Sequence, residues 1–311
     1  MQFSPLSEMR CVVLGGGGFI GTHLCRKLKG KVASLKAFGR RQSFPDALKE
    51  VEWFQGDFND PSSLAAAIEG CDVVFHLVNA TTPSSANVDK VADVRLNVIG
   101  SLQLLEVCRA ENVKRVVFAS SGGTIYGIPE ILPTPEDAPC WPLTSYGISK
   151  LSVERYLHLY SYLYGIDYRV VRVANPYGPL QVASKNQGVI AAFLRRMLSD
   201  QPVEIWGDGS VARDYVYVDD VVDALVLAAS HIGEDSIFNI GSGVARTINE
   251  VIGSLEAVTG RQCRVIRREG RMVDVPVSVL DVSRARDSLK WQPRTPFEEG
   301  LEHTFRWLLK R

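Results

Sequence analysis

A tyrosine and a lysine stand four residues apart in the segment SYGISK, as Tyr146 and Lys150. On a helix this spacing puts both side chains on one face, about one turn apart. A tyrosine with its usual pKa of about 10 is a poor base near neutral pH. A nearby ammonium group stabilises the phenolate, so the pair is suited to removing a proton from a hydroxyl group.

A glycine-rich turn lies far upstream, in the segment VVLGGGGFIGTHL. Gly15, Gly18 and Gly21 recur every three residues between an apolar run and a helix-like segment. Glycine permits a tight turn and a close approach of the backbone to a pyrophosphate, whose charge then meets the free N–H groups of the helix. The position of the turn favours dinucleotide binding over a glycine-rich packing turn, with Phe19 and Ile20 as expected cofactor contacts.

The glycine-rich turn gives the YxxxK pattern its meaning, since that pattern alone is common. When it follows a dinucleotide-binding turn in the sequence, the YxxxK pattern indicates a redox site. A positively charged nicotinamide at such a site also stabilises the phenolate. Lys150 is then expected to hold the nicotinamide ribose as well. Asp57 is a candidate acceptor for the adenine amine, or alternatively a helix cap. Phe58 and Leu77 complete the expected cofactor contacts.

The end of the second predicted strand departs from the usual pattern. An Asp or Glu there normally accepts a hydrogen bond from the adenosine ribose. In the segment KAFGRRQ that position is Gly39, and Arg40 and Arg41 follow. A missing carboxylate beside guanidinium groups suits a 2′-phosphate, unless the arginines are solvated or stack on the adenine. We expect NAD as the cofactor, with NADP as a serious alternative.

Six apolar runs are expected to form the strands that carry these residues: RCVVLGGG, VASLKAF, VEWFQGD, CDVVFHLV, VKRVVFASS and DYRVVRVAN. Helix-like segments alternate with them at 19–30, 60–69, about 89–112 and about 145–165. This alternation predicts an α/β fold with a Rossmann-type doubly wound parallel sheet covered on both faces.

The pattern changes after about residue 175, where loops, short strands and helices mix. We therefore expect a smaller interleaved C-terminal lobe that binds substrate. The predicted dinucleotide-binding domain comprises residues 1–174, and 214–242 return to it. The predicted nucleotide-sugar lobe comprises 175–213 and 243–311.

Composition excludes several classes of protein. The 311 residues contain 35 Lys+Arg and 35 Asp+Glu, so no net charge recruits nucleic acid or an anionic membrane. No apolar run approaches the roughly 20 residues of a membrane span, and the first residues lack an apolar signal core. The six cysteines are scattered, as are the five histidines, so we expect reduced thiols, a cytoplasmic protein and no metal site.

Several segments together resemble one known family: GGGGFIG, SYGISK, NVIGSLQLLE, RVANPYGP, IWGDGSVARDYVYVDDVVDAL and FNIGSG. They are similar to the extended short-chain dehydrogenase/reductases, and within these to the NAD-dependent epimerase/dehydratase branch typified by UDP-glucose 4-epimerase. The resemblance runs from about residue 10 to about 305, with the motifs in family order. It is highly specific for the superfamily and much less specific for the sugar.

The resemblance implies roles for three catalytic residues. Tyr146 matches the catalytic base and Lys150 its partner. Asn97, in RLNVIG, matches an asparagine that braces the active-site helix and relays protons through water. A buried helix residue bonded to a carbonyl is the alternative for Asn97.

Three further residues match positions that bind the nucleotide sugar. Asn175, in VANPYGP, matches a phosphate-binding residue, or is a turn former. Arg213, in VARDYVY, matches a diphosphate-binding arginine, or pairs with Asp214. Arg271, in RMVDVP, matches a second diphosphate arginine in a looser local pattern. Two guanidinium groups suit one diphosphate.

The segment FASSGGTIYG departs from the family at its catalytic hydroxyl. The family's hydroxyl usually stands four residues before the tyrosine of this segment, Tyr126, and here that residue is Gly122. Ser121 and Thr124 are the candidates that remain. Strand residues alternate between faces, which places Thr124 with Gly122. We favour Ser121, because two glycines after it permit a local distortion.

The leading expectation is a nucleotide-sugar 4-epimerase of the UDP-glucose/UDP-galactose type that acts on a UDP-hexose. An NADPH-dependent 4-ketoreductase or a dehydrogenase is the alternative, and a non-catalytic NAD(P) sensor is remote. A 4,6-dehydratase is disfavoured because no Asp-Glu pair follows the strand hydroxyl. Helices at about 98–111 and 149–164 carry apolar residues on more than one face, so we expect a homodimer.

Overall fold

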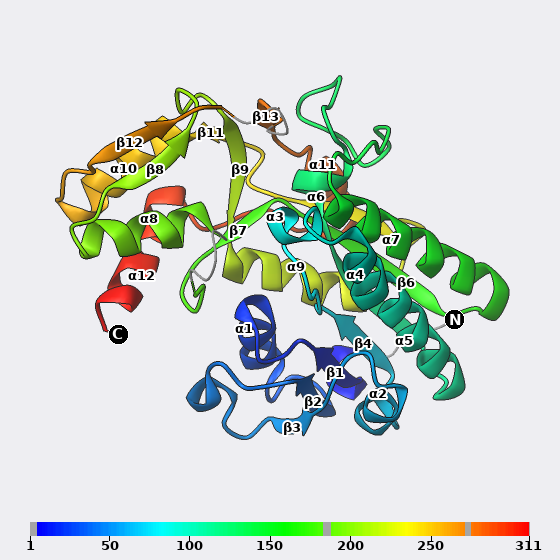
Figure 1. Ribbon diagram of the computed structural model, residues 1–311. Coiled ribbons are helices and arrows are strands. Elements are labelled where there is room, and N and C mark those ends of the chain that lie inside the picture. Colours follow the sequence, from blue (N-terminus) through cyan, green and yellow to red (C-terminus); the bar gives the residue numbers. More distant parts are fainter. Residues whose placement is uncertain (1–4, 183–187, 271–274, 311) are drawn as a thin grey trace.

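A parallel seven-stranded sheet forms the centre of the larger part of the computed structural model, which describes residues 5–182, 188–270 and 275–310 (Figure 1). Its strand order is β10-β6-β5-β4-β1-β2-β3, so the order reverses between β1 and β4. This arrangement confirms the predicted α/β fold. The strands are β1 (Arg10–Leu14), β2 (Ser34–Gly39), β3 (Glu52–Gln55), β4 (Val73–His76), β5 (Arg115–Ser121), β6 (Asp167–Val173) and β10 (Ile237–Ile240).

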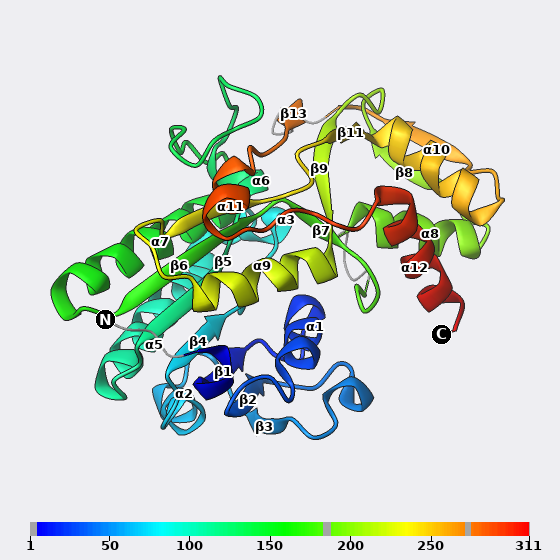
Figure 2. The same ribbon diagram turned by 180° about the vertical axis from the view of Figure 1, so that it is seen from behind.

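Helices cover both faces of this sheet. On one face lie α1 (Phe19–Leu28) and α9 (Val218–Ser230), which are seen in front of the sheet in Figure 2. The opposite face carries α2 (Pro61–Ile68), α5 (Gly100–Ala110) and α7 (Ser145–Tyr164). Residues of β1 alternate between the two cores, Val13 toward α1 and α9 and Val12 toward α2 and α5. Burial on both faces explains why these strands read as nearly continuous apolar runs.

A smaller part with its own apolar core lies beside the C-terminal ends of the strands (Figure 1). Its four-stranded sheet joins β9 to β7, β11 and β13, and a separate pair joins β8 to β12. The prediction that this part forms a substrate lobe stays a prediction. Its elements are β7 (Asn175–Tyr177), α8 (Val189–Leu198), β8 (Val203–Trp206), β9 (Ala212–Tyr217), β11 (Ala245–Thr247), α10 (Ile248–Thr259), β12 (Val265–Arg268), β13 (Val277–Ser278) and α12 (Phe297–Leu309). Helix α11 (Ser283–Ser288) lies between β13 and α12 in the chain and packs on β10 of the large sheet.

The single helix expected over about 89–112 is interrupted, so that prediction was wrong in detail. The segment instead forms α4 (Lys90–Asp93), a π-helical stretch η3 (Val94–Ile99) and then α5. Wider winding of this kind often occurs at functional sites. The remaining short elements are the 3-10 turns η1 (Leu6–Glu8) and η2 (Pro45–Leu48) and the helical turns α3 (Pro83–Ala86) and α6 (Gly122–Ile125).

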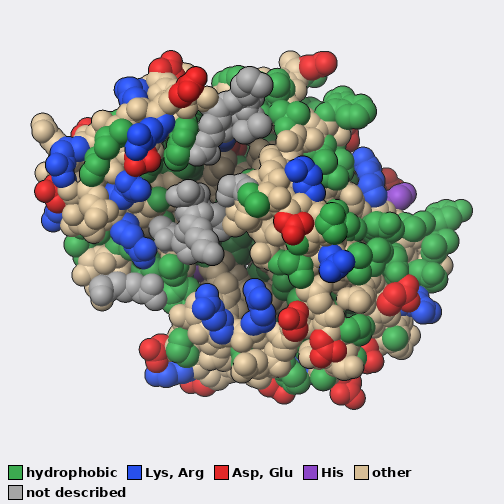
Figure 3. Space-filling model, viewed as in Figure 1, with side chains coloured by type: hydrophobic (Ala, Val, Ile, Leu, Met, Phe, Trp, Pro, Cys, Tyr) green, Lys and Arg blue, Asp and Glu red, His purple; other side chains and the backbone are tan. Residues whose placement is uncertain are grey.

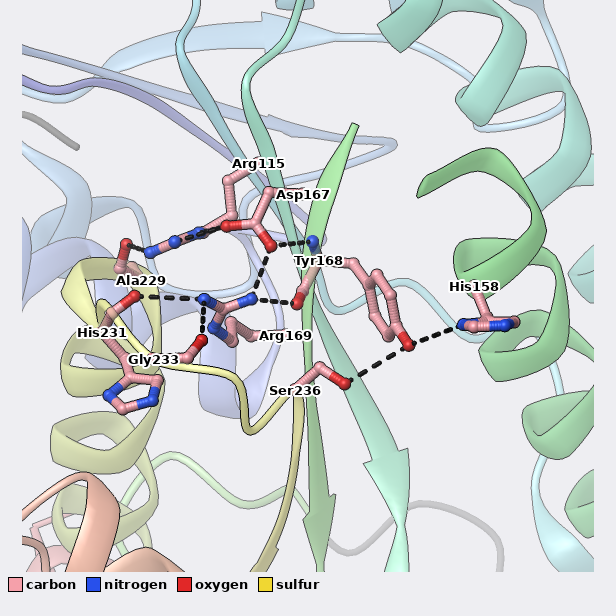
Figure 4. A network of polar contacts seen from close by, with 9 residues as sticks. All are labelled: Arg115, His158, Asp167, Tyr168, Arg169, Ala229, His231, Gly233 and Ser236. Carbon is pink, nitrogen blue, oxygen red and sulfur yellow. Dashed lines mark hydrogen bonds and ion pairs between the residues drawn. The ribbon is translucent and has the colours of Figure 1, made fainter. Parts of the chain in front are cut away.

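A polar network joins α9 to the N-terminal ends of β5 and β6 (Figure 4). Arg115, which is only 1% exposed, donates to Asp167 and to the carbonyl of Ala229. Arg169 donates to the same carboxylate and to the carbonyls of His231 and Gly233. Cations are favourable at the C-terminal end of a helix, so the network fixes α9 to the sheet at the end opposite the glycine-rich turn.

No helix in the described ranges is both long and apolar enough to cross a membrane.

Candidate active site

The glycine-rich turn joins β1 to α1 at the point where the strand order reverses. Gly15 has a φ of +84°, and a Cβ on it would lie 3.2 Å from the carbonyl carbon of Leu77. A Cβ on Gly21 would lie 2.2 Å from the carbonyl oxygen of Gly15. Gly18 caps α1 without a side-chain hydrogen bond, so the first N–H groups of the helix face outward for a ligand. This cradle of backbone fits a pyrophosphate.

The other expected cofactor contacts lie around this turn. Phe19 and Ile20 begin α1 and are half-buried. Leu77 follows β4, and its carbonyl faces Gly15. Phe58 is buried, with its ring stacked on that of His76 at 5.1 Å between centroids. Its ring is therefore part of the core rather than of an open surface.

The structure shows whether Asp57 caps a helix, which was the alternative to a contact with adenine. The helix cap is Asp60, whose carboxylate accepts from the backbone of Ser62 at 3.0 Å. Asp57 is exposed and accepts from the backbone of Asn59 at 2.9 Å. The cap interpretation of Asp57 was therefore wrong, and its role toward adenine stays a prediction.

Tyr146 and Lys150 lie in the first two turns of α7, whose cap is the hydroxyl of Thr144. Lys150 is 5% exposed, and its Nζ donates to the carbonyl of Ala119 at 2.9 Å. The same Nζ lies 5.8 Å from the centre of the Tyr146 ring. Burial lowers the pKa of Lys150 to about 7, while the carboxylates of Glu154 and Asp93 act to raise that pKa.

The hydroxyl of Ser121 affects the pKa of the Tyr146 phenol. Burial raises the pKa of Tyr146 to about 12, and a hydrogen bond from Ser121 opposes that rise. Thr124 lies nearby on α6, but its hydroxyl oxygen is buried and has no hydrogen-bond partner among the described residues. The geometry therefore brings Ser121, Tyr146 and Lys150 together.

Gly122 does not face the site. Strand β5 ends at Ser121 and the chain enters the helical turn α6. A Cβ on Gly122 would lie 2.5 Å from the side chain of Leu280 and 3.1 Å from the carbonyl of Arg172. Alternation along a strand therefore does not apply beyond Ser121, and the argument that grouped Thr124 with Gly122 was wrong.

A buried carboxylate, which sequence reasoning missed, joins η3 to the start of α7. Asp93 is 0% exposed and accepts from the side chains of Asn97, Ser145 and Ser149 at 2.9, 2.9 and 2.6 Å. It also accepts from the hydroxyl of Thr81. The serines flank Tyr146 in sequence, so Asp93 fixes the turn that carries the phenol. Its position four residues before Asn97 was the only signal in the sequence.

Asn97 braces this region with its side-chain amide. Its Oδ1 accepts from the backbone of Ala80 at 2.9 Å, and its Nδ2 donates to Thr81 and Asp93. A cavity of about 10 Å³ is lined by Asn97, Lys150 and their neighbours. That volume is roughly enough for one water molecule. A proton relay through Asn97 stays a prediction.

A second buried pair holds α7 against β6. Glu154 and Arg172 are 3% and 2% exposed, and Nη2 of Arg172 donates to Glu154 at 2.7 Å. Ser120 donates to the same carboxylate, and Arg172 also donates to the hydroxyl of Tyr126 at 2.9 Å. This pair lies one helical turn beyond Lys150.

Two of the expected substrate residues share one face of the smaller sheet. Asn175 on β7 pairs with Tyr215 on β9, two residues from Arg213, so all three side chains have the same orientation. The amide of Asn175 donates to the carbonyl of Asp214 at 3.0 Å, and Arg213 donates to the carbonyl of Val275 at 2.6 Å. Arg271 lies outside the described residues.

The side chain of Asp214 has partners other than Arg213, which the sequence offered as its alternative partner. It is 0% exposed and accepts from the backbone N–H groups of Ser242, Gly243 and Leu280. Neighbours on a strand point to opposite faces, which directs this carboxylate away from the face that carries Arg213.

Comparison with known proteins decides the family. The sequence model of the NAD dependent epimerase/dehydratase family matches residues 11–241. The chain belongs to this family. The resemblance seen in the sequence is thereby confirmed, and the protein is an enzyme of the epimerase type.

Relatives of this epimerase-family chain cover nearly its whole length. A UDP-glucose 4-epimerase of Mycolicibacterium smegmatis is 36% identical over 95% of this chain and 97% of its own. A dTDP-4-dehydro-6-deoxyglucose reductase of Escherichia coli is 29% identical over 94% of this chain and 95% of its own.

Solved structures of family members superpose closely. UDP-glucose 4-epimerase of Thermotoga maritima, solved with UDP-glucose, has a TM-score of 0.92 and 36% identity, covering 97% of this chain and 99% of that one. UDP-glucose 4-epimerase of Thermus thermophilus, solved with NAD, has a TM-score of 0.90 and 32% identity with the same coverage.

Proposed function

We propose that the protein is a nucleotide-sugar 4-epimerase of the UDP-glucose/UDP-galactose type. The observation that carries this proposal is the phenol of Tyr146, one helical turn from the buried Lys150 and with Ser121 acting to lower its pKa, in a member of the epimerase family. This arrangement suits reversible oxidation of a sugar hydroxyl. The names of the relatives support C4 of a UDP-hexose as the reacting centre.

A nicotinamide dinucleotide, NAD or NADP, is the proposed cofactor. The backbone cradle at Gly15, Gly18 and Gly21 fits its pyrophosphate, and Lys150 is proposed to hold the nicotinamide ribose. When bound, the nicotinamide supplies a hydride acceptor and donor for the sugar carbon. Because that chemistry regenerates the cofactor in each turnover, tight binding suits the function.

The proposed role of Tyr146 is to take the proton of the sugar 4-hydroxyl at its phenolic oxygen. Ser121 positions that oxygen and the substrate hydroxyl together. The pKa of Tyr146, about 12 in the chain itself, is too high for a base near neutral pH. Positive charge near the ring lowers the pKa of Tyr146, and both the Lys150 ammonium and an oxidised nicotinamide supply such charge.

The smaller part of the structure is proposed to hold the nucleotide end of the substrate. Asn175 and Arg213 share one face of its sheet, and Arg271 is proposed to join them. Guanidinium groups bind a diphosphate through paired charged hydrogen bonds. With its nucleotide end held, the 4-keto sugar turns and presents its other face before it is reduced.

An assay with purified protein tests this function. UDP-glucose or UDP-galactose is supplied with and without added NAD⁺ or NADP⁺, while the absorbance of reduced nicotinamide is followed. Interconversion of the two sugars without a net absorbance change is expected. Stoichiometric consumption of reduced cofactor with a 4-keto sugar, and no epimer, would contradict the epimerase.

The second candidate is an NADPH-dependent nucleotide-sugar 4-ketoreductase. It uses the same tyrosine, serine and lysine but exchanges its cofactor in every cycle. The absence of a carboxylate at Gly39, the presence of Arg40 and the similarity to a reductase of Escherichia coli favour it.

We propose that the protein forms a homodimer through α5 and α7. Several apolar side chains on and beside these helices are exposed, and Figure 3 shows hydrophobic side chains gathered over α7. Two copies packed through these helices would form a four-helix bundle. Sedimentation at working concentration tests this proposal, and a monomer would contradict it. The exposed residues are Ile99, Ile148, Leu159, Tyr162 and Leu163.

A further inference from the structure

We infer that the adenosine end of the cofactor site is built for a nucleotide with a 2′-phosphate, so that NADPH and NADP⁺ bind more tightly than NADH and NAD⁺. The inference rests on dinucleotide binding in the proposed function and names the form of the cofactor. Three features of the described residues carry it: the end of β2, the segment that follows, and the charges on that segment.

The end of β2 lacks the group that selects an unphosphorylated ribose. Gly39 is the last residue of β2, where a carboxylate would accept from the 2′-hydroxyl and repel a 2′-phosphate. The indole of Trp53 on β3 lies 3.2 Å from the place where a Cβ on Gly39 would stand. The same ring lies 3.0 Å from the place of a Cβ on Gly17. An aromatic surface therefore occupies the space beside both glycines.

The segment after β2 is held directly against the glycine-rich turn. A Cβ on Gly17 would lie 2.3 Å from the carbonyl oxygen of Arg41, so only glycine allows this approach. The backbone N–H of Ser43 donates to the carbonyl of Gly17 at 3.3 Å. The adenosine ribose is bonded to the pyrophosphate that this turn fits, so the segment lies beside the ribose.

The charges on this segment are positive and uncompensated. Arg40 and Arg41 are both exposed, and neither has a hydrogen bond or an ion pair from its side chain to another described residue. The nearby carboxylate of Asp46 pairs with Lys49. Guanidinium groups form paired hydrogen bonds with phosphate oxygens, and a phosphomonoester carries a charge of about −1.5 to −2 near neutral pH.

The first test compares nucleotides on the protein as purified. Nucleotide released by denaturation is identified by mass spectrometry, and NADPH and NADH are titrated by nicotinamide fluorescence. We expect NADPH to bind about 10- to 100-fold more tightly, as one or two charged hydrogen bonds would give. Adenosine 2′,5′-bisphosphate should displace it better than 5′-AMP. Equal affinity, or tighter binding of NADH, overturns the inference.

Variants of Arg40 and Arg41 test whether these two residues cause the tighter binding of NADPH. Arg40→Ala and Arg41→Ala, made singly and together, are expected to weaken NADPH by about tenfold or more and to leave NADH within about twofold. Lys31→Ala is the matched control, an exposed cation in the loop between α1 and β2. Loss of both nucleotides alike in the double variant would mean a general effect on the fold and would contradict a 2′-phosphate site.

A carboxylate placed at the end of β2 gives the reciprocal test. Gly39→Asp is expected to reverse the preference toward NADH, while Gly39→Ala, which adds the Cβ without the charge, keeps it. An unchanged preference in a folded Gly39→Asp variant would contradict the inference.

These binding measurements are independent of sugar turnover. Tighter NADPH binding without interconversion of any sugar would uphold the inference and contradict the epimerase. Interconversion with tightly bound NAD⁺ and no preference for NADPH would do the reverse.

Discussion

The hydroxyl groups of Ser121 and Thr124, the two candidates for the catalytic hydroxyl, differ in their surroundings. That of Ser121 acts to lower the pKa of the Tyr146 phenol, whereas the Thr124 oxygen is buried without a partner in the described part of the chain. A catalytic hydroxyl must touch the reacting atoms. The geometry therefore supports Ser121 as the residue that acts with Tyr146.

Replacing Tyr146 with phenylalanine removes only the proposed base. We expect turnover to fall by about 100-fold or more, while the affinity for the nucleotide sugar is largely kept. Steady-state kinetics and a direct binding titration measure the two quantities. Near-normal turnover would disprove the assignment of the base.

Alanine variants separate the two hydroxyl residues. Ser121→Ala is expected to lower kcat by about 100-fold, with KM for the nucleotide sugar changed only a few-fold, because positioning in the transition state is lost. Thr124→Ala is the matched variant and should stay within about threefold of the wild type. A larger loss in Thr124→Ala than in Ser121→Ala would reverse the assignment.

Asp93 is expected to act through the residues that it positions. Asp93→Asn removes the charge that raises the pKa of Lys150, so the ammonium is lost at lower pH and kcat should decline at lower pH than in the wild type. The pH profile of kcat measures this, and Asp89→Asn, at the exposed cap of α4, is the control. A lower kcat with an unmoved pH profile would indicate a purely structural role.

At the residue scale, spacing in the sequence predicted the pair on α7 and the glycine cradle, because both depend on local geometry. The contacts of Asp93 could not be predicted, since its partners Ser145 and Ser149 lie far away in sequence. The grouping of Thr124 with Gly122 on one strand face was wrong for a related reason. The side chain that excludes a Cβ there, Leu280, comes from a distant segment.

At the scale of elements, α7 depends on buried contacts with two strands. The pair of Glu154 and Arg172 fixes the helix to β6, and Ser120 of β5 bonds the same carboxylate. Helix α7 also carries Tyr146 and Lys150. Displacement of the pair is therefore expected to affect both stability and activity.

Removal of one member of this pair should be more harmful than removal of both. Arg172→Met leaves the Glu154 carboxylate buried without its cation, at a cost of about 3–5 kcal/mol in the free energy of unfolding. The double variant Arg172→Met/Glu154→Leu is expected to recover part of this loss. Urea denaturation measures both values. A double variant as unstable as the sum of the two single variants would contradict the coupling.

Element boundaries were predicted well where the pattern is local and poorly where tertiary bonds intervene. The bounds of α7 agree with the expected 145–165 to within one residue. The helix expected over about 89–112 contains the stretch η3, in which Asn97 binds Ala80, Thr81 and Asp93. No periodicity in the sequence indicates these contacts or the wider winding.

At the scale of the whole molecule, two histidines make the stability depend on pH. Burial lowers the pKa of His76 well below its usual value, and burial lowers that of His231 as well. Each therefore takes up a proton less readily in the folded chain than in the unfolded chain. Their contribution is fully present above the unfolded pKa of about 6.5 and is lost as the pH falls below it.

Urea denaturation between about pH 7 and pH 5 tests this expectation. The free energy of unfolding should decrease as the pH falls, and His76→Asn and His231→Asn should each reduce that slope. Buried carboxyls with raised pKa values, such as that of Asp214, work in the opposite sense. The comparison of slopes between wild type and variants isolates the histidines, and equal slopes would contradict the prediction.

The position of β10 has a consequence for how the chain reaches its fold. This strand pairs with β6 at the edge of the large sheet, but it is synthesised only after β7, β8 and β9 of the smaller part. Until then β6 presents an open row of backbone N–H and C=O groups, a surface that invites pairing with other chains. A nascent chain that has emerged only as far as residue 174 is therefore incomplete at one edge, and a fragment cut there should aggregate. The larger sheet is finished by a late segment, so the larger part cannot be complete before β7, β8 and β9 of the smaller part have been synthesised.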